Sequence, residues 1–379
     1  MDAPTAEHEP PATPHARRAA RWRLVRAGSV VALAVMAACS RAPRRAPAPV
    51  RAPGGAPPVV ADAGARCCAE AGWRIAERHR VAALVGRRFT SAQLWAAVVP
   101  VVERAASADG AAPPTLAVRR IGRSVEGRPL RAVTFGQGPT RVLLWSQMHG
   151  DESTATMALA DVIAWMGDPA SRGDPLHARL AGALTVVMVP MLNPDGAERF
   201  LRANARGVDV NRDAHRLRTP EARALKALRD SIRPAFGFNL HDQGARTIGG
   251  PAGPLVAVAL LAPPAGADGA YGPTRAAARL VAADLAALLE RELPGRVAKY
   301  DERFEPRAFG DLMQRWGTST VLIESGALPG DPEKQRLRAV NVVAIVSALD
   351  AIATGRFRAA DPRAYDALPG NGAARAAHR

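Results

Sequence analysis

Residues 141–152 read Arg141-Val-Leu-Leu-Trp-Ser-Gln-Met-His149-Gly-Asp-Glu152, an apolar run that ends in a histidine and a carboxylate. The apolar run predicts a buried strand, and the apolar spacing of residues 154–166 predicts a helix directly after it. A spacing of three lets both side chains project toward one point. In open α/β sheets, ligands bind in the crevice at the carboxyl ends of the strands. Because a catalytic zinc usually takes three protein ligands and a water, we expect a third ligand from elsewhere in the chain.

The rest of the chain alternates between predicted strands and predicted helices. The predicted strands are 115–121, 130–135, 184–190, 236–240, 255–261 and 318–323. The predicted helices are 68–81, 91–106, 220–232, 273–293 and 331–354. Such alternation predicts an α/β fold, with a largely parallel or mixed sheet covered by helices on both faces.

The composition is that of a large globular protein with a basic surface. The chain has 379 residues, 48% hydrophobic residues, 4% aromatic residues and a formal net charge of +16. The basic residues are mostly arginine, and alanine and proline are also abundant. This combination indicates a compositional bias spread over the surface, without a basic run interleaved with aromatic residues. We therefore expect no nucleic-acid partner.

The N-terminal region has the pattern of an export signal. A basic stretch precedes an apolar run at 27–38, and small residues precede Cys39. The apolar run is short for a membrane span. The segment Val35-Met-Ala-Ala-Cys39 looks like a bacterial lipoprotein signal, in which the cysteine is lipidated. We expect an exported, periplasmic or cell-envelope protein with a membrane tether through Cys39; an ordinary cleaved signal or an uncleaved anchor is the alternative.

The third ligand has few candidates. After His149, the histidines of the folded region are His177, His215 and His241. His177 lies in a polar stretch and is expected at the surface, and His215 lies near arginines in a loop. His241 directly follows a predicted strand, so it occupies the carboxyl end of a strand as His149 does. We therefore predict that His149, Glu152 and His241 bind zinc.

At these positions the sequence resembles the zinc carboxypeptidases related to carboxypeptidase A, over roughly residues 115–354. The resemblance is carried by separated motifs in a fixed order, namely His149-Gly-Asp-Glu152, Asn193-Pro-Asp-Gly196, Arg202, Gly207-Val-Asp209-Val-Asn211-Arg212, His241 and Glu324. The resemblance implies a twisted mixed sheet of about eight strands between helices. It also implies one zinc ion per chain on the two histidines and the glutamate.

The resemblance further implies the roles of five residues around the metal. Glu324 would be the general base that collects the proton of the attacking water. Arg202 would stabilise negative charge on the carbonyl oxygen, whereas Asn211 and Arg212 would bind the free carboxylate of a peptide substrate. Asp209 would accept a hydrogen bond from a zinc-binding histidine and so fix its ring.

The part of the site that contacts the substrate side chain is less defined by the resemblance. Tyr300 is the nearest candidate for the family's mobile substrate-capping tyrosine, ahead of Tyr271. The specificity pocket should lie within residues 303–316. There Phe309 suggests an apolar floor and Asp311 suggests a preference for basic side chains.

These features divide the chain into five segments and give one leading hypothesis. The segments are an export signal (1–39), a Pro/Ala/Arg-rich tether (40–65), an N-terminal helical segment (66–114), the catalytic domain (115–355) and a disordered tail (356–379). The leading hypothesis is a metallocarboxypeptidase that removes C-terminal residues from peptides. The alternatives are a zinc deacylase acting on N-acyl amino acids and a binding lipoprotein without activity.

Overall fold

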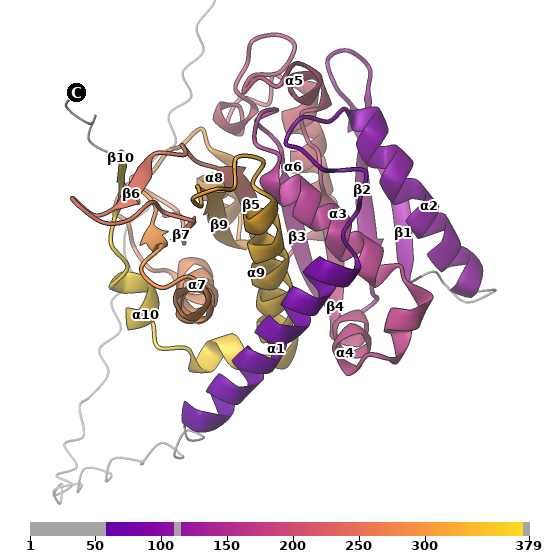
Figure 1. Ribbon diagram of the computed structural model, residues 1–379. Helices are drawn as coiled ribbons and strands as arrows, with labels where there is room; N and C mark the ends of the chain where they lie inside the picture. Colours follow the sequence, from indigo (N-terminus) through magenta and orange to yellow (C-terminus); the bar gives the residue numbers. More distant parts are fainter. Residues whose placement is uncertain (1–57, 110–114, 374–379) are drawn as a thin grey trace, which may run out of the picture. The chain divides into compact units, whose positions relative to one another are not determined.

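Apolar runs form an eight-stranded sheet at the centre of residues 58–109 and 115–373, the part of the chain that the computed structural model describes (Figure 1). The strands are β1 (Leu116–Arg123), β2 (Pro129–Phe135), β3 (Thr140–Ser146), β4 (Leu184–Val189), β5 (Phe236–Asp242), β7 (Val258–Leu261), β8 (Val297–Lys299) and β9 (Ser319–Ser325). A second, two-stranded sheet pairs β6 (Thr247–Gly249) with β10 (Asn371–Ala373).

Ten α-helices and three short 3-10 helices connect these strands in the described residues. The α-helices are α1 (Pro58–Arg78), α2 (Ser91–Asp109), α3 (Thr154–Met166), α4 (Pro175–Ala183), α5 (Pro194–Arg199), α6 (Pro220–Ile232), α7 (Pro273–Glu292), α8 (Phe309–Arg315), α9 (Gln335–Thr354) and α10 (Arg363–Asp366). The 3-10 helices are η1 (Pro169–Gly173), η2 (Val210–Arg212) and η3 (Arg356–Ala359).

The order of strands in the large sheet is β1-β2-β4-β3-β5-β9-β7-β8. The central strands β4, β3, β5 and β9 run parallel, whereas β2 and β7 run antiparallel to their neighbours β4 and β9. The predicted mixed sheet of about eight strands is therefore confirmed. Because β3, β5 and β9 are adjacent and parallel, their carboxyl ends meet at one edge of the sheet.

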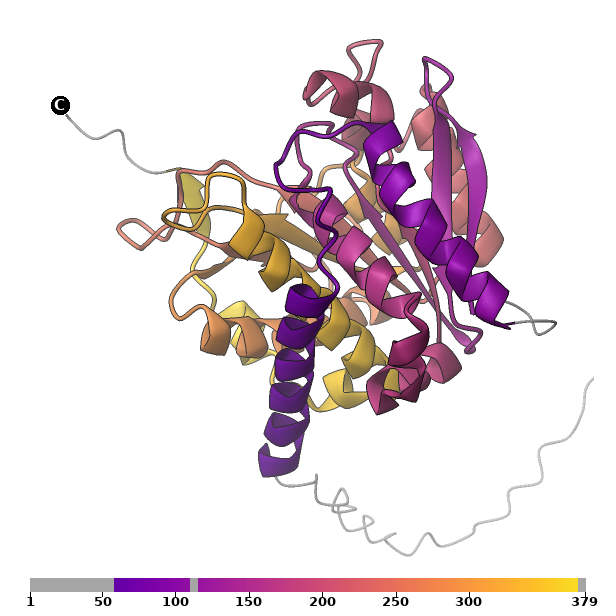
Figure 2. The same cartoon turned by 45° about the vertical axis from the view of Figure 1, so that its right-hand side comes forward.

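Helices cover both faces of the sheet (Figures 1 and 2). Successive side chains of β3 point to opposite faces and contact different helices. Val142 and Leu144 pack into a core with residues of α1, α2, α3, α4, α7 and α9. Leu143 and Trp145 point to the opposite face and pack against residues of α6 and α8. Helix α9 is long and apolar enough to cross a membrane, but 83% of its apolar window is buried in the fold, as expected for a core helix.

The N-terminal helices belong to the same core as the sheet. Helix α1 begins at Pro58, inside the segment that the sequence assigned to the tether, and packs against α9. Helix α2 packs against α3 and β1. Residues 66–109 are therefore not a separate body. The export signal and the rest of the tether lie outside the described residues.

The prediction of a disordered tail from Arg356 is wrong for residues 356–373. Tyr365 is fully buried, and its hydroxyl oxygen accepts a hydrogen bond from the backbone N–H of Ala262 at 3.1 Å. Strand β10 then pairs with β6. Average polarity misled the prediction because a few apolar side chains, Phe357, Tyr365 and Leu368, anchor an otherwise polar segment.

The expected surface position of His177 is also wrong. His177 lies in α4, is 3% exposed, and places its ring edge-on to Phe135 and Trp165. Its Nε2 atom lies 3.0 Å from the carbonyl oxygen of Met166. The residue is thus a hydrogen-bonded core histidine, and it lies outside the cluster formed by His149, Glu152 and His241.

Candidate metal centre and substrate cleft

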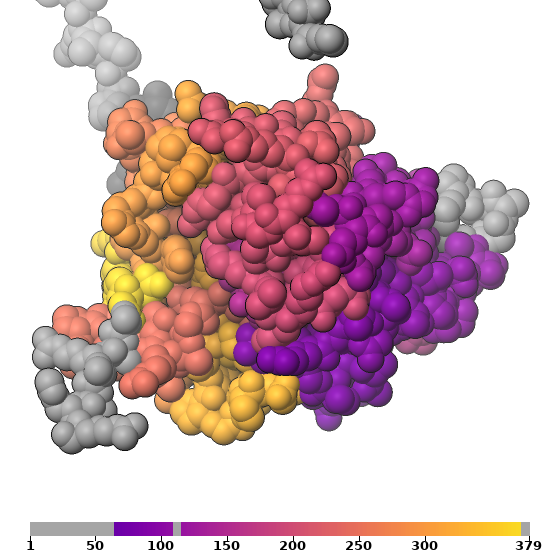
Figure 3. Space-filling view, turned by 90° about the horizontal axis from the view of Figure 1, so that it is seen from above, coloured from indigo at the N-terminus to yellow at the C-terminus, as the bar shows by residue number. Residues whose placement is uncertain are grey.

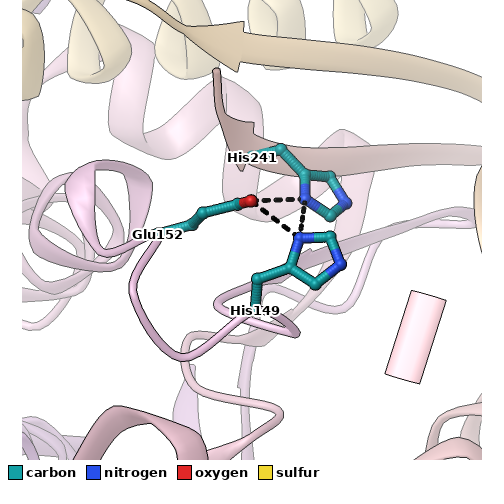
Figure 4. Close-up of side chains that lie close together, drawn as sticks. All are labelled: His149, Glu152 and His241. Carbon is teal, nitrogen blue, oxygen red and sulfur yellow. Dashed lines mark hydrogen bonds and ion pairs between the residues drawn. The ribbon is translucent and has the colours of Figure 1, made fainter. Parts of the chain in front are cut away.

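Three side chains from two adjacent strand ends converge on one point (Figure 4). The Nδ1 atoms of His149 and His241 lie 3.2 Å apart, and each is within hydrogen-bonding distance of one oxygen of Glu152, at 2.8 and 2.6 Å. All three residues are buried. Two imidazole nitrogens and one carboxylate are a donor set that zinc prefers. The predicted ligands therefore come together in a geometry that fits a metal ion.

The loop that carries His149 is supported by the Asn193-Pro-Asp-Gly196 motif. A Cβ atom added at Gly150 would lie 2.0 Å from the backbone carbon of Gly196, so the two loops touch without room for a side chain. Asn193 caps α5 through the N–H of Gly196 and donates its amide to the carbonyl oxygen of Met148 at 3.3 Å. The same amide reaches the carbonyl oxygen of Arg202. The motif therefore fixes the metal loop and Arg202 together.

The ionisable groups of the triad shift one another's pKa values. Burial disfavours the charged form of His149, yet the Glu152 carboxylate and the hydrogen bond with Asp209 raise its pKa to about 9. Burial lowers the pKa of His241 below its usual value. Burial opposes charge on Glu152 as well, but the two imidazoles hold its pKa well below the ordinary range. Glu152 is thus ionised, as a metal-binding carboxylate must be.

Residues of the long loop before α6 hold the triad from the cleft side. Asp209 Oδ1 lies 2.9 Å from Nε2 of His149, the ring nitrogen that faces away from the cluster. Arg202 pairs with Asp209 at 3.0 Å and with Glu152 at 3.1 Å. The amide nitrogen of Asn211 lies 3.4 Å from Nε2 of His241. Asp209 can accept a hydrogen bond from Nε2–H of His149, which orients a ring that binds metal through Nδ1. The Asn211 amide nitrogen is a donor, since its oxygen accepts from the backbone N–H of Phe309, so it does not have this role for His241.

Glu324 stands beside the triad because of strand register. In the parallel pair β5–β9, Glu324 is the Cα partner of His241, so both residues lie at the same level of adjacent strands. Glu324 is 7% exposed and lines the same cleft as the three ligand residues. Burial, and then the nearby charge of Glu152, raise its pKa well above the ordinary value for a glutamate. A carboxylate in such a setting can take and return a proton.

Asp242, the extra carboxylate that follows His241 in the sequence, is occupied by other partners. Its Oδ2 atom accepts a hydrogen bond from Thr154 at 2.7 Å and lies 3.1 Å from Nζ of Lys334 and 3.4 Å from the Arg87 guanidinium. Lys334 also donates to the carbonyl oxygen of Ser325. The carboxylate is therefore held in a buried network that joins the two strand ends behind the triad.

The triad opens into a cleft of about 740 Å³. Arg202, Asn211, Arg212 and Tyr300 all line it, so the structure brings the predicted substrate-binding residues together with the ligands. The negative charge of Glu324, together with burial, raises the pKa of Tyr300 to about 12. Seen from above the sheet, the chain near residue 200 (crimson) lies between the chain near residue 300 (orange) and the N-terminal helices (purple) (Figure 3).

The other substrate-side candidates separate into those that line the cleft and those that do not. Asp311 lines the cleft, and burial raises the pKa of its carboxyl to about 6. Phe309 is fully buried in the core against Trp316, so it does not form an apolar floor. Tyr271 lies over Arg275 with 42% of its surface exposed and is not a cleft residue.

Two cleft residues had no signal in the sequence. Asn371 of β10 lines the cleft and donates its amide to Gln243 at 3.0 Å. Glu305, in the loop before α8, lines the cleft and lies 3.4 Å from Nε of Arg212. Glu305 reaches the site from an irregular loop and Asn371 from a short C-terminal strand, and no motif predicts the course of either segment.

Comparisons with known proteins agree with this geometry. A family model described as zinc carboxypeptidase matches residues 106–242. Carboxypeptidase D from Mus musculus is 34% identical over a match that covers 28% of this chain and 10% of that protein. Carboxypeptidase SOL1 from Arabidopsis thaliana is 30% identical over 32% of this chain and 28% of that protein. The chain thus spans less than a third of the length of these curated relatives.

Solved structures extend the match to most of the fold. A metallo-carboxypeptidase from Burkholderia cenocepacia aligns over 70% of each chain with a TM-score of 0.53 and 20% identity. Carboxypeptidase A from Helicoverpa armigera aligns over 70% of this chain and 74% of that chain, with a TM-score of 0.54 and 15% identity. The resemblance to zinc carboxypeptidases that the motifs indicated is therefore confirmed, and the fold is of the carboxypeptidase A type.

Proposed function

We propose that the protein is a zinc-dependent metallocarboxypeptidase that hydrolyses the C-terminal peptide bond of peptides. The observation that carries this proposal is the convergence of His149, Glu152 and His241 in one cleft with Glu324 and Arg212. The three ligand residues would hold one zinc ion per chain. When bound, zinc supplies the Lewis acidity that lowers the pKa of a water and polarises a carbonyl.

The chain's own residues supply the remaining chemistry. Glu324 takes the proton of the attacking water and passes it to the leaving amine. Arg202 offers positive charge to the carbonyl oxygen as negative charge develops there. Its ion pairs with Glu152 and Asp209 hold the guanidinium at the triad before substrate arrives. Preorganisation of this kind is what makes a charge effective in a transition state.

The far side of the cleft selects a free C-terminus. Arg212 presents a planar guanidinium that suits a carboxylate, and Asn211 lies next to it in η2. Tyr300 lines the same cleft and would close over the bound residue. Asp311 also lines the cleft, where an ionised carboxylate favours a basic C-terminal side chain. The proposed substrates are therefore peptides that end in arginine or lysine.

One assay separates this function from its alternatives. An N-blocked dipeptide ending in free arginine, the same dipeptide with a C-terminal amide, and an N-acyl arginine are compared with and without a chelator. We expect rapid hydrolysis of the free dipeptide alone, loss of activity with chelator, and recovery on addition of zinc. Faster hydrolysis of the N-acyl amino acid favours a deacylase. Binding of the dipeptide without turnover of any substrate favours an inactive binding protein.

The location of the enzyme is a separate part of the proposal. The apolar run 27–38 and Cys39 support export to the cell envelope with a lipid tether. In a bacterial host we expect the protein in the membrane fraction and Cys39→Ser in the soluble fraction or unprocessed. An N-terminus mapped elsewhere, with unchanged fractionation, would contradict the tether.

A further inference from the structure

The guanidinium that is proposed to bind the substrate carboxylate already faces a carboxylate of the protein. Nε of Arg212 lies 3.4 Å from Oε2 of Glu305. Glu305 belongs to the loop between β8 and α8 and lines the same cleft as Arg212. Both side chains are partly exposed, at 38% and 27%. The contact is thus at the cleft surface, where an incoming peptide can reach it.

Glu305 is held in this place by Arg307. The Arg307 guanidinium binds both Glu305 oxygens, at 2.8 and 2.6 Å, and the Arg307 backbone N–H donates to the same carboxylate at 3.1 Å. The backbone N–H of Glu305 in turn donates to Asp311 at 3.0 Å. The hydrogen bonds from Arg307 lower the pKa of Glu305 to about 2. The group is therefore a fixed negative charge.

Arg202 and Arg212 differ in how closely they pair with carboxylates of the protein. Arg202 makes two ion pairs of 3.0 and 3.1 Å with the carboxylates around the triad. The contact of Arg212 with Glu305 is longer than the 2.7–2.9 Å usual for charge-assisted N–H···O bonds. Glu305 can lose its contact with Arg212 and keep its hydrogen bonds with Arg307. The weak pair is therefore the one that a substrate can exchange.

We propose that Glu305 is an affinity-setting residue that occupies the place of the substrate's C-terminal carboxylate on Arg212 and must be displaced on binding. The inference rests on the proposed function, in which Arg212 binds that carboxylate. Glu305 sets the substrate affinity of the site because the carboxylate of every peptide competes with the Glu305 carboxylate for Arg212. Glu305 should not affect the chemical step, because within the described part of the chain it has no contact with Glu324 or with the predicted metal ligands.

The test measures KM and kcat for the free and the amidated dipeptide. Glu305→Gln should lower KM for the free dipeptide about two- to five-fold, the range that a partly exposed ion pair gives, with kcat unchanged. The amidated dipeptide should show no change. Asp301→Asn is the matched control, because Asp301 lies in the same loop and lines the cleft but pairs with Arg303. It should leave KM unchanged.

A second variant changes KM in the opposite direction. Arg307→Met removes the partner that shares Glu305, so the carboxylate moves fully onto Arg212 and KM for the free dipeptide rises. In the Glu305→Gln background, Arg307→Met should have no effect. A rise in KM with Glu305→Gln would show that Glu305 orients Arg212 and would overturn the proposal. An equal fall for free and amidated peptides, or with Asp301→Asn, would overturn it too.

The failure of the proposed function is distinguishable from the failure of this inference. If the parent protein does not cleave the C-terminal bond of the free dipeptide, the proposed function fails. If the parent cleaves it and Glu305→Gln leaves KM where it was, only the competition between the two carboxylates fails.

Discussion

The metal half of the cleft and its substrate half are built from different parts of the chain. The half that is proposed to hold the metal and the general base, the metal half, consists of His149, Glu152, His241 and Glu324, all buried at or beyond the ends of the parallel strands β3, β5 and β9. The half that is proposed to bind the substrate, the substrate half, consists of Arg212, Tyr300, Glu305, Asp311 and Asn371, which come from η2, the loop between β8 and α8, helix α8 and strand β10. His241 and Glu324 lie on adjacent strands, and side chains on strands are held more tightly than side chains on loops such as that of Glu305.

The comparison teaches that chemistry and selectivity are supported separately in this fold. Neighbouring strands fix the distance between His241 and Glu324 through backbone hydrogen bonds. In the substrate half, side-chain contacts also hold Glu305 and Asn371, through Arg307 and Gln243. Changes in the metal half should therefore remove the reaction, whereas changes in the substrate half should alter which peptides react.

The largest expected effects lie in the metal half and divide metal binding from proton transfer. His241→Ala removes a ligand and should abolish zinc binding. Glu324→Gln keeps the shape of the side chain and removes the base, so zinc content should persist while kcat falls roughly 10²- to 10⁴-fold, the usual scale of general acid–base catalysis. Metal analysis and steady-state kinetics on both variants measure the two effects.

Two results would contradict this division of roles. A His241→Ala protein with full zinc content would remove His241 from the metal site. Near-parent turnover by Glu324→Gln would mean that another group is the base. Either result would contradict the assignment of metal binding and proton transfer to the metal half.

The same division explains how far the sequence predicts the structure. The fold and the convergence of His149, Glu152 and His241 were predictable because apolar runs mark strands and the predicted ligands lie at or after the carboxyl ends of adjacent strands. Helices α3 and α6 also begin and end at the residues that the sequence predicts. Regular elements carry local signals of this kind.

The substrate half could not be predicted in the same way. Asn371 lies in a segment that average polarity marks as disordered, and only long-range contacts such as that of Tyr365 with Ala262 place it at the cleft. Glu305 pairs with Arg212 across 92 residues of intervening sequence without any motif. Phe309 and Asp311 are two residues apart in α8, yet one lines the core and the other the cleft.

The next largest effect concerns the recognition of the free C-terminus. Arg212→Ala removes the guanidinium that is proposed to bind the substrate carboxylate, so kcat/KM for the free dipeptide should fall about 10- to 100-fold, consistent with about 1.5–3 kcal/mol for a hydrogen bond to a charged group. The kcat/KM for the amidated dipeptide, which is already low in the parent, should change little. Equal losses for both peptides would count against an exopeptidase and in favour of an endopeptidase or a deacylase.

A smaller effect should appear in the pH dependence of side-chain preference. Burial raises the pKa of Asp311 to about 6, so its carboxyl is charged above that pH and becomes neutral as the pH falls through it. The ratio of kcat/KM for peptides ending in arginine over leucine should be highest near pH 8 and fall roughly ten-fold by pH 5, about the value of one hydrogen bond to a charged group.

The ratio of kcat/KM for the two substrates is the right measurement, because the titration of catalytic groups affects both substrates equally and cancels in the ratio. Asp311→Asn is the control: its ratio should be low and flat across the same range. If the parent ratio does not change between pH 8 and pH 5, Asp311 is a structural acceptor for the Glu305 N–H and does not select the side chain.

The smallest effect tests whether the C-terminal segment holds the substrate half in place. Tyr365→Phe removes the hydroxyl that accepts the Ala262 N–H and leaves that buried donor without its partner, which costs about 1–3 kcal/mol. The loss should appear as a lower midpoint of unfolding and faster proteolysis of residues 356–373, with zinc content unchanged. Tyr271→Phe is the matched control, because that ring is 42% exposed, and it should change stability by at most about 0.5 kcal/mol. Zinc loss in Tyr365→Phe, at a temperature where the protein is folded, would show that the C-terminal segment supports both halves of the cleft and that the two are not independent.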